Sequence, residues 1–79
     1  MTNHPNRSRA ANPANNPTPG EIYWARIDAG LTQKQAGELV YVSERAWRNW
    51  EADSSIMSHR RMHPAIWELF LIKTNQMDI

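Results

Sequence analysis

The sequence of 79 residues contains no cysteine. This absence excludes a disulfide framework and any thiolate-based zinc site, so stability must come from packing. A hydrophobic content of 41% over this length allows one small domain. Long apolar runs are also missing: the longest uninterrupted one, Leu-Phe-Leu-Ile at 69–72, is far below the roughly 20 residues of a membrane span. The N-terminus has no apolar segment of the kind that directs secretion. We therefore expect a cytoplasmic protein with no membrane partner.

Charge of one sign is not in excess either, because the net charge is +1. Residues 21–53 hold four Lys or Arg against six Asp or Glu. No general positive field would draw nucleic acid to the chain, so any specific contact needs a few well-placed side chains. The sequence also shows no nucleophile–base pair, phosphate loop or metal-binding cluster. We expect no enzymatic activity, no cofactor or metal, and no small-molecule ligand.

The first seventeen residues lack any large aliphatic or aromatic side chain after Met1 and consist mostly of Asn, Pro, Ala, Ser and Arg. This composition predicts a disordered tail at 1–17, followed by a domain at 18–79. Arg7 and Arg9 in the tail leave two interpretations open. They form either an arm that enters a DNA minor groove or a solubilising segment without a contact.

Helix signals begin at Thr18, which is followed by a proline suited to the first helical position and by Glu21 at capping-box spacing. The first helix should end near Ala29, because Gly30 is a favourable residue just after a helix. Both ends of this element are therefore marked in the sequence.

A second cap signal follows at Thr32, with Gln35 at the same capping-box spacing, and predicts a helix to about Val40. Ser43 is the third N-cap candidate and predicts a helix at 44–52. Two short helices joined by a tight turn form a helix-turn-helix. Ala36 and Gly37, listed here as the small residues of the second helix, would allow the close crossing that this arrangement needs.

The last helix should begin at Pro64, after a loop at 53–63 that carries at most a turn of helix. Its apolar residues cover more than one side, which is typical of a helix buried on two faces. A core of about this size can hardly surround such a helix, so we expect part of it to lie in a homodimer interface formed by Ile66, Trp67, Phe70 and Leu71. The fold class is therefore all-α, with four to five helices.

The third predicted helix has two different faces. Trp47 and Trp50 lie three apart and share one side, where we expect them to pack in the core rather than stack on nucleic acid. The opposite side carries side chains that can contact base edges in a major groove, where arginine pairs with guanine and asparagine with adenine. The alternative is an ordinary solvated face, with Glu44 and Arg48 as an ion pair at i,i+4 spacing. The base-contacting candidates are Ser43, Glu44, Arg45, Arg48 and Asn49.

The stretch GLTQKQAGELVYVSERAWRNWEA, with ARIDAG overlapping its start, resembles the helix-turn-helix of the Cro and phage-repressor (Xre) family. The resemblance covers residues 21–53. It implies a sequence-specific regulator of transcription that binds double-stranded DNA, most often as a homodimeric repressor on an inverted-repeat operator in the bacterial cytoplasm. The RNWEA ending and the following HPAIWELFLIKT are similar to anti-CRISPR-associated repressors, which implies control of a phage operon.

Side chains that fix the protein on phosphates are expected at the start of the second helix and in the loop after the third. His59 and His63 flank the loop arginines, but two histidines without further ligands do not predict a metal site. Backbone contact by the loop arginines is the better interpretation. The expected backbone-contacting residues are Thr32, Gln33, Lys34, Arg60 and Arg61.

Three residues depart from the family pattern. Tyr41 stands where the family has a glycine with positive φ, so either a strained conformation is kept or the turn is reshaped. Asp53 replaces the glycine that commonly ends the third helix. Glu44 repels phosphate but can accept a hydrogen bond from cytosine.

One other functional class remains open from the sequence alone. The Trp- and Phe-rich C-terminal helix is also compatible with a protein–protein interaction module, such as an antitoxin-like chain or a phage protein that binds a partner. A homodimer in solution would disfavour this alternative.

Overall fold

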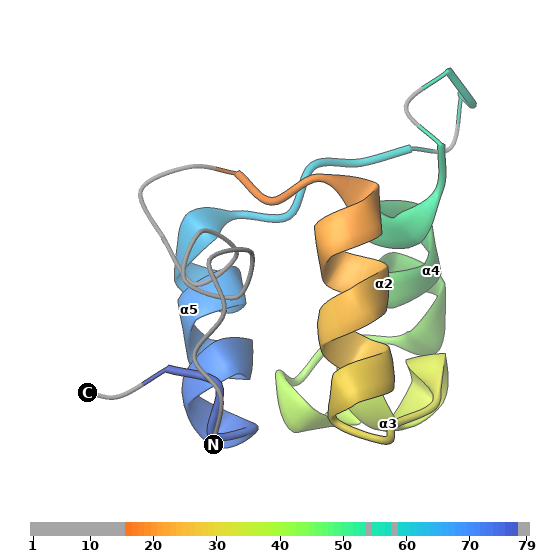
Figure 1. Cartoon of the computed structure of the whole chain (residues 1–79). Coiled ribbons are helices and arrows are strands. Elements are labelled where there is room, and N and C mark those ends of the chain that lie inside the picture. Colours follow the sequence, from red (N-terminus) through yellow and green to blue (C-terminus); the bar gives the residue numbers. More distant parts are fainter. Residues whose placement is uncertain (1–15, 54, 58, 78–79) are drawn as a thin grey trace.

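The computed structural model describes residues 16–53, 55–57 and 59–77. Within them the chain forms four helices and no strand: α2 (Pro19–Asp28), α3 (Gln33–Leu39), α4 (Glu44–Glu51) and α5 (Pro64–Lys73). Figure 1 shows α2 and α5 side by side, with α3 crossing below and α4 behind α2. The all-α prediction is confirmed, and none of these helices is both long and apolar enough to cross a membrane. The predicted disorder at 1–17 concerns mostly residues outside the described part.

A side-chain acceptor caps the start of each helix. Thr18 and Thr32 each accept the amide N–H three residues later, and the Glu or Gln at that position returns a bond to the cap backbone. Ser43 Oγ accepts the amide of the third residue after it at 3.0 Å. His63 Nδ1 accepts the amide of the second residue after it at 2.9 Å. The predicted caps of the first three helices are therefore confirmed.

Three of the helices end in the same way, with a residue of positive φ directly after the cap: Gly30, Tyr41 and Asn75, at 73°, 66° and 61°. At the end of α3, the amide of Tyr41 donates to Glu38 O at 3.2 Å and that of Val42 to Gly37 O at 2.9 Å. This is the Schellman pattern, which satisfies carbonyls at a helix end. Tyr41 keeps the strained conformation, at a cost of about 1–2 kcal/mol for a residue with a Cβ, and the reshaped-turn alternative is wrong.

The end of α4 is different, because its cap residue Ala52 is extended, with φ −68° and ψ 145°. Among the described non-glycine residues, the positive-φ positions are Tyr41 and Asn75 alone. Asp53 therefore needs no glycine-like conformation. Its carboxylate instead accepts from the amide of Ser55 at 2.8 Å.

The core draws on every helix and on the segment before α5. Its buried hydrophobic residues are Ile22, Ala25, Ala36, Val40, Trp47, Met62, Trp67, Phe70 and Leu71. The rings of Trp47 and Phe70 lie 4.9 Å apart, so α4 and α5 meet through aromatic side chains. The C-terminal segment closes over α2, where Gln76 Nε2 donates to Ala25 O at 3.1 Å.

This packing corrects the expected dimer interface. Trp67, Phe70 and Leu71 are at most 2% exposed within one chain, so a partner cannot reach them. Ile66, the fourth expected interface residue, is half-buried and packs against the same core. The prediction failed because it counted only helices around α5. Met62 before the helix and Met77 after it also cover the apolar surface of α5.

Candidate nucleic-acid interface

The unit formed by α3, the turn at 40–43 and α4 has the helix-turn-helix arrangement that the sequence predicts. Its tightest point is Gly37, where a Cβ would lie 2.9 Å from Val42 O and 3.0 Å from Ser43 O. Both contacts are with backbone, which cannot move without changing the turn. Gly37 therefore lets α3 pass against the start of α4, and the buried Ala36 beside it completes the crossing.

The inner side of α4 is fixed by its tryptophans. Trp47 is fully buried, and Trp50 is half-buried with its ring 5.6 Å from that of Trp47. The expectation that both pack against the core is confirmed. Because these rings anchor one side of α4, the opposite side is held at the surface with little freedom to rotate.

The outer side of α4 carries the five expected base-contacting residues. Glu44, Arg45 and Arg48 are exposed, and Asn49 is half-buried. The Ser43 hydroxyl is engaged as the α4 cap, although a hydroxyl that accepts one bond can still donate another. Arg45 and Arg48 are therefore the longest hydrogen-bond donors that α4 presents to a ligand.

Glu44 and Arg48 form the ion pair expected of a solvated helix face, with Arg48 Nη2 donating to Glu44 Oε2 at 2.9 Å. Their side chains are 43% and 56% exposed, respectively. An exposed i,i+4 pair contributes only about 0.3–0.5 kcal/mol. A bidentate contact of arginine with guanine discriminates by about 1–3 kcal/mol. The ion pair is therefore weak enough to be exchanged for a base contact.

The expected backbone-contacting residues of α3 lie at its N-terminus. The Thr32 hydroxyl accepts the Gln35 amide at 3.1 Å, as part of the capping box. Lys34 is exposed and points to no printed partner in this part of the chain. Gln33 is half-buried, and its Nε2 donates to Glu51 Oε1 at 3.1 Å. Lys34 thus remains open to a phosphate, whereas the Gln33 amide is already oriented from within the protein.

The loop arginines have a different setting. The connection from α4 to α5 projects beyond the end of α4 (Figure 1), and the Arg60 amide ties it to Asn49 O at 3.1 Å. The Arg60 guanidinium donates to Met57 O and His59 O, so it braces its own loop. Arg61 Nη2 donates to Asn16 Oδ1 at 3.3 Å, near the N-terminal side of the domain. Both side chains are exposed.

Glu51 is the centre of a hydrogen-bond network that joins three helices. Arg26 on α2 donates through Nε to Glu51 Oε2 at 2.6 Å and through Nη2 to Oε1 at 3.1 Å. Trp47 Nε1 donates to Glu51 Oε2 at 2.5 Å. Arg26 also reaches Leu31 O at 3.0 Å through Nη1. With the bond from Gln33, this carboxylate fixes the start of α3 against the end of α4.

The network decides the ionisation of Glu51. Burial by itself would raise its pKa, because the side chain is only 7% exposed. The hydrogen bonds from Arg26, Trp47 and Gln33 and the positive charge of Arg26 outweigh burial and hold the pKa of Glu51 below its usual value. The carboxylate is therefore charged at neutral pH and serves as an acceptor for all three donors.

Sequence analysis did not identify this network, although a signal was present. Arg26 lies four residues after the buried Ile22, so the helical repeat places it on the inner side of α2. An arginine on that side needs an acidic partner. Glu51 lies four residues after Trp47, which places it on the inner side of α4 by the same rule.

The described residues contain no group of three or more His, Cys, Asp or Glu that could hold a metal ion. In comparisons with known proteins, no family model matches the chain and no curated protein matches its sequence. The arrangement of α3, the turn and α4 is thus the observation from which a function has to be argued.

Proposed function

We propose that this protein is a sequence-specific regulator of transcription that binds double-stranded DNA through the outer side of α4. The observation that carries the proposal is the division of α4 into two sides. Trp47 and Trp50 anchor the inner side in the core, while Arg45 and Arg48 stand exposed on the outer side. A helix of this kind fits the major groove, where guanidinium groups can pair with guanine.

The neighbouring helix supplies the second part of the proposal. Lys34 is exposed in the first turn of α3, and the α3 start is fixed against the end of α4 by Gln33 and Glu51. Contacts from such positions hold a protein in register on phosphates without reading sequence. In this proposal Thr32, Gln33 and Lys34 position the domain, Arg60 and Arg61 add backbone contacts, and α4 discriminates between bases.

The repressor role and the phage operon in this proposal come from the resemblance to the Xre family and to anti-CRISPR-associated repressors. The same resemblance supports a homodimer on an inverted repeat, with half-sites about 34–36 Å apart. The apolar side chains of α5 no longer support that dimer, because the core accounts for their burial.

The direct test is selection of bound duplexes from a randomised pool, together with a labelled fragment from immediately upstream of the gene. The proposal predicts an enriched motif bound at least about 10³-fold more tightly than scrambled DNA. Equal affinity for all duplexes, or no binding at micromolar protein, would overturn it.

The alternative of a protein–protein interaction module depended on the C-terminal helix. That helix uses Trp67, Phe70 and Leu71 inside its own domain. These residues therefore offer no docking surface to a partner, and DNA binding through α4 is the function that the geometry supports best.

A further inference from the structure

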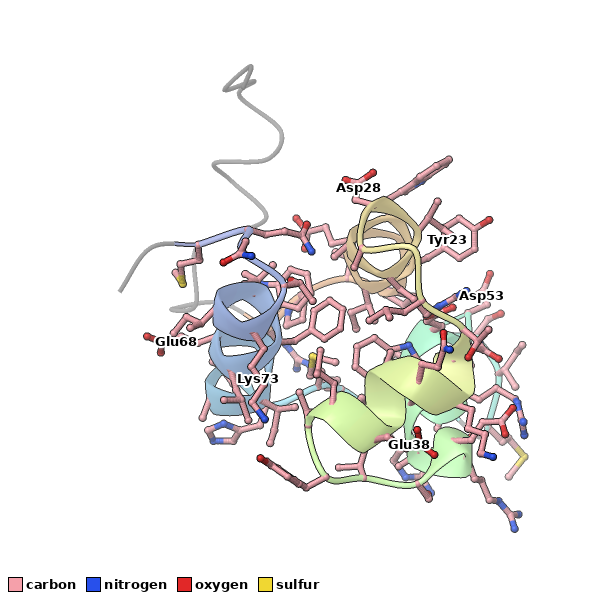
Figure 2. All side chains as sticks on the ribbon, turned by 90° about the horizontal axis from the view of Figure 1, so that it is seen from below. Tyr23, Asp28, Glu38, Asp53, Glu68 and Lys73 are labelled. Carbon is pink, nitrogen blue, oxygen red and sulfur yellow. The ribbon has the colours of Figure 1, made fainter. Side chains whose placement is uncertain are left out.

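Lys73, the last residue of α5, reaches across to the end of α3. Its Nζ donates to Leu39 O at 2.9 Å and to the Tyr41 hydroxyl at 2.8 Å. The same nitrogen lies 4.1 Å from the centre of the Tyr41 ring. Figure 2, seen from below, shows Lys73 on the side of α5 that faces α3. One ammonium group thus touches both the last residue of α3 and the turn.

Each of these contacts meets a need of the turn. Leu39 is the last residue of α3, so its carbonyl has no partner within the helix, and a cation is favourable at this end of the helix dipole. Tyr41 has a positive φ, which a glycine would adopt without strain. The Schellman bonds explain the left-handed conformation but not the choice of tyrosine. Only the ring and hydroxyl distinguish Tyr41 from glycine, and both contact Lys73.

The phenol also responds to this neighbour. The hydrogen bond from Lys73 and its positive charge lower the pKa of the Tyr41 hydroxyl. Tyr41 is 79% exposed, so the surrounding protein does little to hold its ring. Lys73 is the contact that fixes this side chain in place.

We infer that Lys73 is a positioning residue for α4, acting through Tyr41 and the end of α3. Two residues after Tyr41 the chain reaches Ser43, the cap of α4, so the backbone angle at Tyr41 sets the direction in which α4 leaves the turn. A recognition site must be held within about 0.5 Å and 10–20° of its productive geometry. The inference deepens the proposed function and rests on it, because it assigns Lys73 to the accuracy with which α4 meets base edges.

Lys73→Met tests the inference, since it keeps an unbranched side chain and removes the charge and the donors. Lys73 is exposed, so the variant should remain folded. We expect cognate affinity to fall about tenfold while non-cognate affinity changes less than twofold, with an unchanged salt dependence. Lys73→Arg should restore most of the preference, because it returns a charged donor.

Lys34→Met is the matched control for direct phosphate contact. It should weaken all duplexes alike and reduce the salt slope by about 0.9. If Lys73→Met gives this pattern instead, Lys73 contacts DNA itself and the inference is wrong. A loss of thermal stability with wild-type base preference would assign Lys73 to folding alone and would also overturn it.

Tyr41→Gly provides the second arm, because glycine keeps the positive φ but offers Lys73 no ring or hydroxyl. If Lys73 acts through Tyr41, adding Lys73→Met to Tyr41→Gly should change the base preference much less than it does in the wild type. Additive effects would contradict the coupling. In a Tyr23→Phe background, ultraviolet titration should show the Tyr41 phenol pKa rising in Lys73→Met, and an unchanged titration would show that the contact does not exist in solution.

A measurement without DNA separates this inference from the proposed function. Residual dipolar couplings should show that α4 changes its orientation relative to α3 in Lys73→Met but not in Lys34→Met. An unchanged orientation would overturn the positioning role even if the wild type binds DNA specifically. A changed orientation in a protein that binds no duplex would support the role of Lys73 in holding α4 while the proposed function fails.

Discussion

Gly37 lies where the turn passes closest to α3. The carbonyl oxygens of Val42 and Ser43 occupy the space that a side chain would need, at 2.9 and 3.0 Å from an added Cβ. The first backbone atoms of the recognition unit are therefore in contact, and the position tolerates only a hydrogen.

Gly37→Ala should destabilise the domain by about 1–3 kcal/mol, because the added methyl group forces the turn away from α3. Gly20→Ala is the matched control. A Cβ at Gly20 would lie 4.0 Å from its nearest contact, so this change should be neutral or stabilising by up to about 1 kcal/mol, as expected for Gly→Ala in a helix. Urea denaturation of both variants would measure the difference, and equal midpoints would contradict the close crossing.

Glu51 gives a prediction for pH. Its folded-state pKa is held below the ordinary value of 4.5 by its three donors despite burial. Ionised Glu51 therefore adds stability that is fully present above the unfolded pKa and is lost as the pH falls through the folded pKa. Glu51→Gln should cost on the order of 3 kcal/mol at neutral pH, because it leaves the half-buried Arg26 charge without a counterion.

The measurement is the urea midpoint between pH 2 and pH 7. The wild type should lose stability below pH 4.5, while Glu51→Gln should show a flatter profile over the same range. Glu38→Gln removes an exposed carboxylate from α3 (Figure 2) and serves as the control. If Glu51→Gln and Glu38→Gln have the same profile, the network does not hold the charge of Glu51.

At the scale of elements, α2 and α4 each carry tryptophan, but in opposite settings. Trp47 is fully buried in α4, whereas Trp24 on α2 is 61% exposed. Trp47→Ala should cost about 3–5 kcal/mol, because it empties a core position of that size. Trp24→Ala should stay within about 0.5 kcal/mol of the wild type. Thermal denaturation would compare them, and a similar loss in both would show that the core is not where the structure places it.

The helices themselves were largely predictable from sequence, because their signals are local. The caps at Thr18, Thr32 and Ser43 and the stop at Gly30 act within a few residues. The burial of α5 was not predictable in this way, since it depends on Met62 and Met77 folding over the helix from both sides. Hydrophobic pattern shows that a helix is buried but not what covers it.

The candidate site divides along the same line. The two sides of α4 follow from helical spacing, so the inner tryptophans and the outer arginines were found from sequence. Arg26 and Glu51 are 25 residues apart, and Tyr41 and Lys73 are 32 apart. No local rule pairs such residues, because only the assembled fold brings them together.

At the scale of the whole molecule, the homodimer is a prediction of the family resemblance. Sedimentation at micromolar concentration should give a species near twice the chain mass of 9.2 kDa. A monomer at all concentrations, both free and on a single half-site, would contradict it. Phe70→Asp is no test of the dimer, because it places a carboxylate in the core and should unfold the chain.

The central claim is that α4 reads base edges while α3 holds the phosphates. The measurement that tests it most directly is competition binding of Arg45→Ala, Arg48→Ala, Asn49→Ala and Lys34→Ala across a library of singly substituted operators. Arg48→Ala should weaken the cognate site by about 1–3 kcal/mol and relax the preference at one base pair per half-site. Lys34→Ala should weaken every duplex alike. If all three α4 variants keep the wild-type base preferences, α4 is not the recognition helix and the account is wrong.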